Sequence, residues 1–257
     1  MRSLFSRIVT LAFLTGAMAC ATLSPMPECL DNVDRQPQRQ IVWRPVSGDL
    51  LQAMKSQMDP AWRNDPGAVV EVNPDKCIVY SPEPKTFGDL LEFWRLGDGI
   101  ERCYRPRRPL ALADVESEMS KEITVVPDAK EFRVKPEYRR YEVSLTPVLM
   151  PKKNVGDLAA LLDPVMDEIK DYYRLYGFSL PDPSTQPVNC MVVAPRVESH
   201  KDRLATTILG HEFLHCVYGS WHPVDDRDQQ EFGVLHYQPE LKEVRRNLEE
   251  LLKEKGE

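Results

Sequence analysis

Two stretches of the chain repeat one pattern of apolar and polar positions over 27 residues. The first runs from Cys77 to Cys103 and the second from Cys190 to Cys216. Each begins with a short apolar run, continues through a loop marked by proline, and ends in a segment with apolar residues at helical spacing. This pattern predicts a buried strand followed by an amphipathic helix.

The two stretches align without a gap and are identical at eight positions, including a Leu–Gly pair at 96–97 and 209–210. A further match lies upstream, where SGDLLQAM at 47–54 resembles VGDLAALL at 155–162. Chance similarity between two strand–helix pieces is the alternative, but it does not explain the matched cysteine spacing. We therefore predict an α+β fold with an internal duplication of a strand–helix unit.

The same repeat predicts the disulfide bonds. If both copies share a fold, the equivalent bonds are Cys77–Cys103 and Cys190–Cys216. Each bond would tie a strand to the helix that follows it. In the chain-entropy model, closing a loop of this size stabilises the fold by about 3–4 kcal/mol.

The N-terminal pattern differs from the rest of the chain. Residues 1–19 combine basic residues, an apolar run too short to span a bilayer comfortably, and small residues before Cys20. This is the pattern of a secretory signal peptide. The sequence GAMAC also resembles a bacterial lipobox, in which Cys20 becomes the lipidated first residue. We therefore expect an exported, periplasm-facing protein of the bacterial envelope with a lipid anchor on Cys20; the alternative is a Cys20–Cys29 disulfide.

Composition narrows the function classes. Hydrophobic residues make up 42% of the chain and charged residues 28%, which is typical of a soluble globular protein. The formal charge of −7 excludes a nucleic-acid partner, because no extended basic face could neutralise a phosphate backbone. The one basic cluster, RPRRP at 105–109, is interpreted as a solvated linker.

Three of the five histidines lie in one segment, LGHEFLHCVYGSWHP at 209–223. Residues four apart on a helix share a face, so His211 and His215 can bind one metal ion. Glu212 would lie beside that metal. His222, which follows the end of the helix, can return as a third ligand. Three protein ligands leave one position for water, which distinguishes catalytic zinc from structural zinc.

The sequence HEFLH at 211–215 matches the HExxH motif of zincin metallopeptidases, and His222 makes the segment resemble the longer metzincin signature. The resemblance implies a zincin-like fold, a Zn²⁺ ion held by the two motif histidines, and Glu212 as the general base. The segment departs from metzincins in the position of its glycine and in lacking a methionine turn.

Two further roles depend on residues after the motif. A thermolysin-like arrangement would replace His222 as third ligand by Glu231 or Glu240. Charge that develops on the substrate carbonyl oxygen also requires a hydrogen-bond donor. Three donors are near in sequence, namely Tyr218, His236 and Tyr237, and we select Tyr237.

The first copy lacks this set, because Asp98, Gly99 and Arg102 align with the motif histidines and glutamate. Between the two Cys-to-Cys stretches, residues 161–178 are expected to form an amphipathic helix that ends at Gly177. The chain is divided into a signal peptide at 1–19, a tether at 20–40, a degenerate first repeat at 41–110, a connector at 111–140, a metallopeptidase-like second repeat at 141–225, and a C-terminal helical tail packed on the core at 226–257.

Together these features predict an exported zinc peptidase that hydrolyses amide bonds in a peptide or protein substrate. Two alternatives stay open. One is a non-catalytic envelope scaffold braced by disulfides and a metal site. The other is a zinc amidase that acts on cell-wall peptides, because the same water chemistry would serve both substrates.

Overall fold

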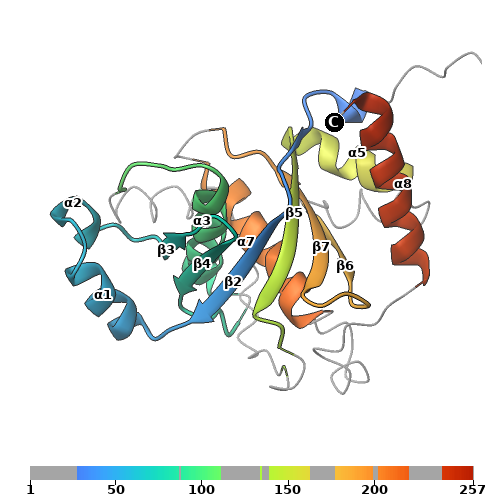
Figure 1. The fold of residues 1–257 in the computed structure, drawn as a ribbon. Coiled ribbons are helices and arrows are strands. Elements are labelled where there is room, and N and C mark those ends of the chain that lie inside the picture. Colours follow the sequence, from blue (N-terminus) through green and yellow to red (C-terminus); the bar gives the residue numbers. More distant parts are fainter. Residues whose placement is uncertain are drawn as a thin grey trace, which may run out of the picture.

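The computed structural model describes residues 28–86, 88–110, 134, 139–162, 177–198, 202–219 and 239–256. They form a mixed sheet with helices packed on it (Figure 1), which agrees with the predicted α+β class. The strands are β1 (Asp34–Arg35), β2 (Arg39–Pro45), β3 (Val69–Val72), β4 (Lys76–Ser81), β5 (Glu142–Met150), β6 (Phe178–Asp182) and β7 (Val188–Pro195). The helices are η1 (Glu28–Leu30), α1 (Gly48–Ser56), α2 (Pro60–Arg63), α3 (Leu90–Tyr104), α5 (Lys152–Leu162), α7 (Arg203–Tyr218) and α8 (Pro239–Lys255).

The two halves of the sheet have the same pairing pattern. The strand order is β3-β4-β2-β5-β7-β6, with β1 paired to β5. In each half the inner strands are parallel, β2 with β4 and β5 with β7, and the outer strand is antiparallel to its neighbour. Each half also ends in a long helix, α3 or α7. The strand–helix units predicted from the repeated sequence are therefore present in both halves.

The halves meet at an antiparallel pair of corresponding strands, β2 and β5. Ile41 pairs with Cys77 in the first half, as Leu145 pairs with Cys190 in the second. The residues just before these, Gln40 and Ser144, lie directly opposite one another. Corresponding positions therefore face each other across an approximate twofold axis at the centre of the sheet.

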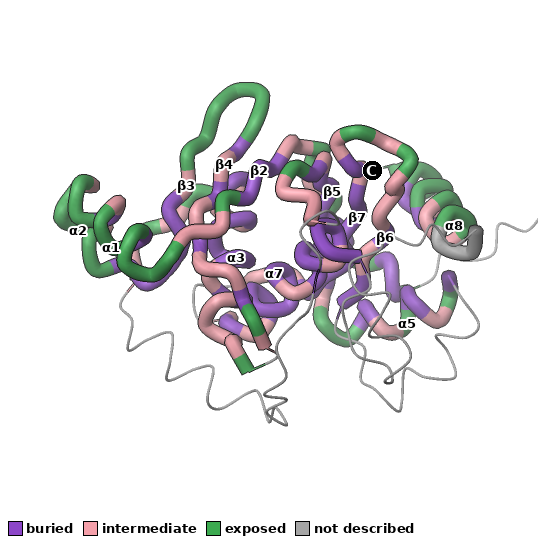
Figure 2. The backbone as a smooth tube through the Cα atoms, turned by 90° about the horizontal axis from the view of Figure 1, so that it is seen from below, coloured by how far each residue is buried: buried purple, intermediate pink, exposed green. Residues whose placement is uncertain are grey.

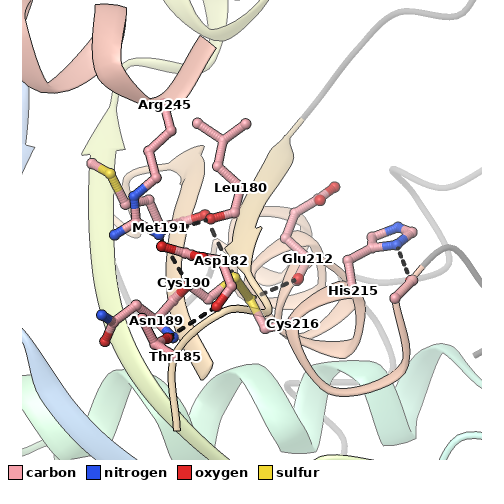
Figure 3. The surroundings of a disulfide bond; sticks show 11 residues. Leu180, Asp182, Thr185, Asn189, Cys190, Met191, Glu212, His215, Cys216 and Arg245 are labelled. Carbon is pink, nitrogen blue, oxygen red and sulfur yellow. Dashed lines mark hydrogen bonds between the residues drawn. A yellow bond between two sulfur atoms is a disulfide. The ribbon is translucent and has the colours of Figure 1, made fainter. Parts of the chain in front are cut away.

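Both predicted disulfides are present. Cys77 is bonded to Cys103 with a Cα–Cα distance of 5.8 Å, and Cys190 to Cys216 with 5.9 Å. They tie β4 to α3 and β7 to α7, and Figure 3 shows the second bond beside the histidine helix. Cys29 is a buried free thiol, whereas Cys20 lies outside the described residues, so the Cys20–Cys29 alternative stays untested.

The long helices α3 and α7 cross where the repeated Leu–Gly pairs meet. A Cβ atom on Gly97 would lie 1.8 Å from the carbonyl oxygen of Thr206, and one on Gly210 would lie 2.0 Å from that of Phe93. The two contacts are reciprocal, because Phe93 and Thr206 occupy corresponding positions in the repeat. The shared glycines therefore allow the two backbones to touch.

The opposite face of the second half is covered by α5, α8 and η1. Leu248 and Leu252 of α8 are fully buried in a cluster with Met150 of β5 and Met191 of β7. This packing confirms that the C-terminal helix covers the core. Burial is concentrated in the sheet and α7, whereas α1 and α2 are largely exposed (Figure 2).

Candidate metal centre

The predicted histidine helix is confirmed as α7. The Asp202 carboxylate accepts a hydrogen bond from the amide of Ala205 at the start of the helix. The helix ends at Gly219, whose φ of 73° lies in the region that glycine adopts most readily. Within α7 only Leu204, His211 and His215 are partly exposed, so both histidines lie on the accessible side of an otherwise buried helix.

The two histidine rings lie close together, with centroids 5.3 Å apart and ring planes at 67°. Nδ1 of His215 is 2.9 Å from the carbonyl oxygen of Gly219. A carbonyl oxygen can only accept, so Nδ1 carries the proton and Nε2 retains its lone pair. Burial lowers the pKa of His215 to about 4, which keeps the ring neutral, as metal binding requires.

Glu212 projects from α7 three residues before His215 (Figure 3). The residue is only 7% exposed. Burial raises the pKa of its carboxyl group to about 8, because a carboxylate loses hydration in this environment. A raised pKa in a buried carboxyl on the same helix as two neighbouring histidines is typical of a functional site.

The structure thus brings the rings of His211 and His215 together and places Glu212 on the same helix, but it leaves the other predicted site residues untested. His222, Glu231, His236 and Tyr237 lie outside the described residues, as does the side chain of Glu240. Within the described ranges, no group of three or more His, Cys, Asp or Glu side chains is placed to hold a metal ion. The third ligand therefore stays a prediction.

Tyr218, one of the oxyanion donors considered, has a different partner. Its hydroxyl donates to the carboxylate of Glu83, which also forms an ion pair with Arg139 at 3.0 Å. The Arg139 guanidinium lies 5.6 Å from the centre of the Tyr218 ring, and Tyr218 itself is 1% exposed. These contacts brace the end of α7 and make Tyr218 a structural residue.

The first half of the chain contributes a wall of the site. Phe93 of α3 lies with its ring centre 5.4 Å from that of His211. Neither Phe93 nor Glu83 was identified from the sequence, since both are more than a hundred residues from the motif. The repeat marked α3 as the counterpart of α7, but the contact between the two helices is seen only in the structure.

The counterpart of the metal motif in the first half is a buried ion-pair network. Asp98, which corresponds to His211, is 2% exposed and accepts a 2.8 Å hydrogen bond from Nη2 of Arg107. The same guanidinium donates to Asp65 at 2.7 Å. The interpretation of 105–109 as a solvated linker is therefore wrong for Arg107, because two buried carboxylates need its charge.

Because of Glu101 on α3, we expect the stability of the folded protein to depend on pH. Burial, together with the negative charge of Asp98, raises its pKa to about 7. A raised folded-state pKa means that this contribution to stability is fully present below about pH 4.5 and is lost as the pH rises through 7. In wild type, this should lower the free energy of unfolding by about 1–3 kcal/mol as the pH rises. Glu101→Gln, whose side chain stays neutral, should not show this decrease.

The measurement is chemical unfolding of both proteins at several pH values between 4.5 and 8. Glu212 and His215 also titrate, so the quantity compared is the difference between wild type and variant. A difference that does not change with pH would contradict the assignment to Glu101.

Comparisons of the chain with protein-family models, with curated proteins and with solved structures found no match. Among the helices in the described ranges, none is long and apolar enough to cross a bilayer. The two disulfides are compatible with an exported protein. The assignment of function therefore depends on the chemistry of the motif and its surroundings.

Proposed function

We propose that this protein is an exported zinc peptidase in which His211 and His215 hold the metal and Glu212 is the general base. The observation that best supports the proposal is the hydrogen bond of 2.9 Å between Nδ1 of His215 and the Gly219 carbonyl. A metal-binding histidine usually donates its other ring N–H in this way, which sets the tautomer and the ring orientation.

The spacing of the two rings also fits a shared metal ion. Two imidazoles bound to one zinc at Zn–N distances near 2.1 Å and a tetrahedral angle have ring centres about 5 Å apart. The centres of His211 and His215 are 5.3 Å apart. Nitrogen donors of this type suit zinc among the common divalent metals. His222 is the proposed third ligand, with Glu231 or Glu240 as the alternative.

When bound, zinc would lower the pKa of a coordinated water and polarise the substrate carbonyl. Glu212 would accept a proton from the attacking water and deliver it to the leaving amine. A positive charge near the histidines favours the ionised carboxylate and so offsets the effect of burial on Glu212. Tyr237 is the proposed donor to the developing oxyanion.

The surroundings of Glu212 favour a peptide substrate. In the part of the chain that the structure describes, β6 pairs with β7 on one side only. The residue before β6, Gly177, contacts the Glu212 side chain. An extended peptide can add to an open strand edge through main-chain hydrogen bonds, and a peptide bound there would lie beside the proposed base. We further propose that a lipid on Cys20 anchors the protein to the membrane.

Metal content tests this proposal. Purified mature protein should contain about one zinc per chain, and the double variant His211→Ala/His215→Ala should contain none. His200→Ala serves as the control, since this histidine lies outside the motif, and it should retain the metal. Folded wild type that takes up no zinc when supplied with it would contradict the metal centre.

Substrate screening separates the three functions. The zinc-loaded protein and the double variant would be assayed against peptide libraries and against purified cell-wall peptides. Cleavage of the libraries supports the peptidase, and cleavage of the cell-wall material alone supports the amidase. Bound zinc without either activity supports the envelope scaffold.

A further inference from the structure

We infer that Gly177 is a positioning residue for Glu212: the absence of a side chain at Gly177 makes room for the carboxylate and sets where it lies. The inference rests on the proposed function, because Glu212 acts as the base only in that reaction. Gly177 directly precedes β6; residues 163–176 lie outside the described residues, so its expected role as the end of a helix stays a prediction.

The contact between the two residues is close. A Cβ atom on Gly177 would lie 2.8 Å from Cγ and 3.0 Å from Oε1 of Glu212, and 2.7 Å from Cγ2 of Ile208. Real Cβ atoms almost never approach other heavy atoms so closely, so an added methyl must be accommodated by a shift of its neighbours, of which Glu212 contributes two of the three nearest atoms. Positive φ angles are confined, among the described glycines, to Gly219 and Gly256. Gly177 is therefore required by this contact and not by its own backbone conformation.

The first half of the chain contains the corresponding contact, but there the residue before the strand carries a side chain and the residue on the helix is glycine. Strand pairing defines the correspondence: Val69 pairs with Tyr80 as Phe178 pairs with Val193. The residue preceding each outer strand is Ala68 in the first half and Gly177 in the second.

The partners on the helices correspond as well, Gly99 on α3 and Glu212 on α7. A Cβ atom on Gly99 would lie 2.9 Å from Cβ of Ala68, and 2.4 Å from Cγ1 of Val79, a side chain that can rotate as the Ala68 methyl cannot. At this position the fold thus leaves space for a side chain on the strand or on the helix, but not on both. In the second half the space is given to the helix residue, which is the proposed base.

This arrangement explains how one half can carry a buried carboxylate where the other carries none. Glu212 replaces a glycine, and the added side chain fits because glycine replaces alanine on the strand. The HExxH motif alone does not show this requirement, because Gly177 lies 35 positions before Glu212. Gly177 is thus a residue that acts on the proposed site through the position of Glu212.

Steady-state kinetics with zinc-loaded Gly177→Ala provides the first test. A shift of the base by about 1 Å is expected to lower kcat by about 10–100-fold, with KM and zinc content little changed. In the Glu212→Gln background the same substitution should lower the residual kcat no further. Wild-type kcat in Gly177→Ala would overturn the inference.

A stability cycle tests the contact without any activity. Gly177→Ala is expected to lower Tm by about 3–8 °C in the wild type. In the Glu212→Ala background it should lower Tm by less than half as much, because only the Ile208 contact remains. Gly156→Ala, where a Cβ atom meets nothing within 4 Å, is the matched control and should not lower Tm.

The two readouts separate the inference from the proposed function. Non-additive Tm values in a protein that cleaves no amide substrate would reject the peptidase but retain the Gly177–Glu212 contact. Additive Tm values together with unchanged kcat in an active enzyme would reject the role of Gly177 and leave the peptidase intact.

Discussion

Glu212→Gln is expected to lower kcat for peptide cleavage by about 10²–10⁴-fold while zinc content stays near one per chain. Glutamine has nearly the size of glutamate, so the space beside Gly177 stays filled, but it cannot accept a proton. Because the side chain is 7% exposed, bulk water has little access to replace it as a base. The measurement is kcat and KM of the zinc-loaded variant against the best library peptide.

Glu101→Gln is the matched control for this loss of activity. Glu101 is a second glutamate whose pKa is raised by burial, and it lies on α3, the helix that corresponds to α7. The substitution should leave kcat unchanged. If Glu212→Gln retains wild-type kcat, Glu212 is not the base, even if zinc is bound.

Gly97→Val is expected to lower the free energy of unfolding by about 3 kcal/mol or more, enough to prevent folding of a marginally stable chain. The Cβ atom would lie 1.8 Å from a backbone carbonyl oxygen of the neighbouring helix and 2.9 Å from the Gly210 amide nitrogen. Backbone atoms cannot turn aside as a side chain can, so α3 and α7 must separate. Denaturant unfolding measures the loss.

Two controls accompany the helix-crossing variant. Gly210→Val should have a loss of similar size, because its Cβ atom would lie 2.0 Å from the Phe93 carbonyl oxygen. Gly156→Ala in α5 should have no loss and gain up to about 1 kcal/mol from helix propensity. Equal stability of Gly97→Val and wild type would show that the helices do not touch at these glycines.

Much of the architecture could be predicted from the repeated pattern. It identified both disulfides and the order of strand and helix in each half, because cysteine spacing and apolar periodicity are local properties of the chain. The HExxH motif predicted that His211 and His215 would lie close together on a helix for the same reason, since four residues are about one helical turn.

What could not be predicted depends on contacts between distant segments. Arg107 stands in a proline-flanked basic run, and nothing in that run shows the two buried carboxylates that it neutralises. Gly177 was predicted only as a helix end, and nothing in its local sequence shows that it also faces Glu212 across the fold. Phe93 and Glu83 meet α7 only through the pairing of the two halves.

Residues at equivalent positions of the two halves contact each other, and this bears on how the candidate site came to lie in one half only. Gln40 faces Ser144, and the Gly97 and Gly210 contacts are reciprocal, so the surface that joins the halves is self-complementary, as in a twofold homodimer. In a homodimer every substitution occurs twice. A single chain removes that constraint, so that one half can hold His211 and Glu212 while the other exchanges them for Asp98 and Gly99 and becomes the scaffold against which the histidine helix rests.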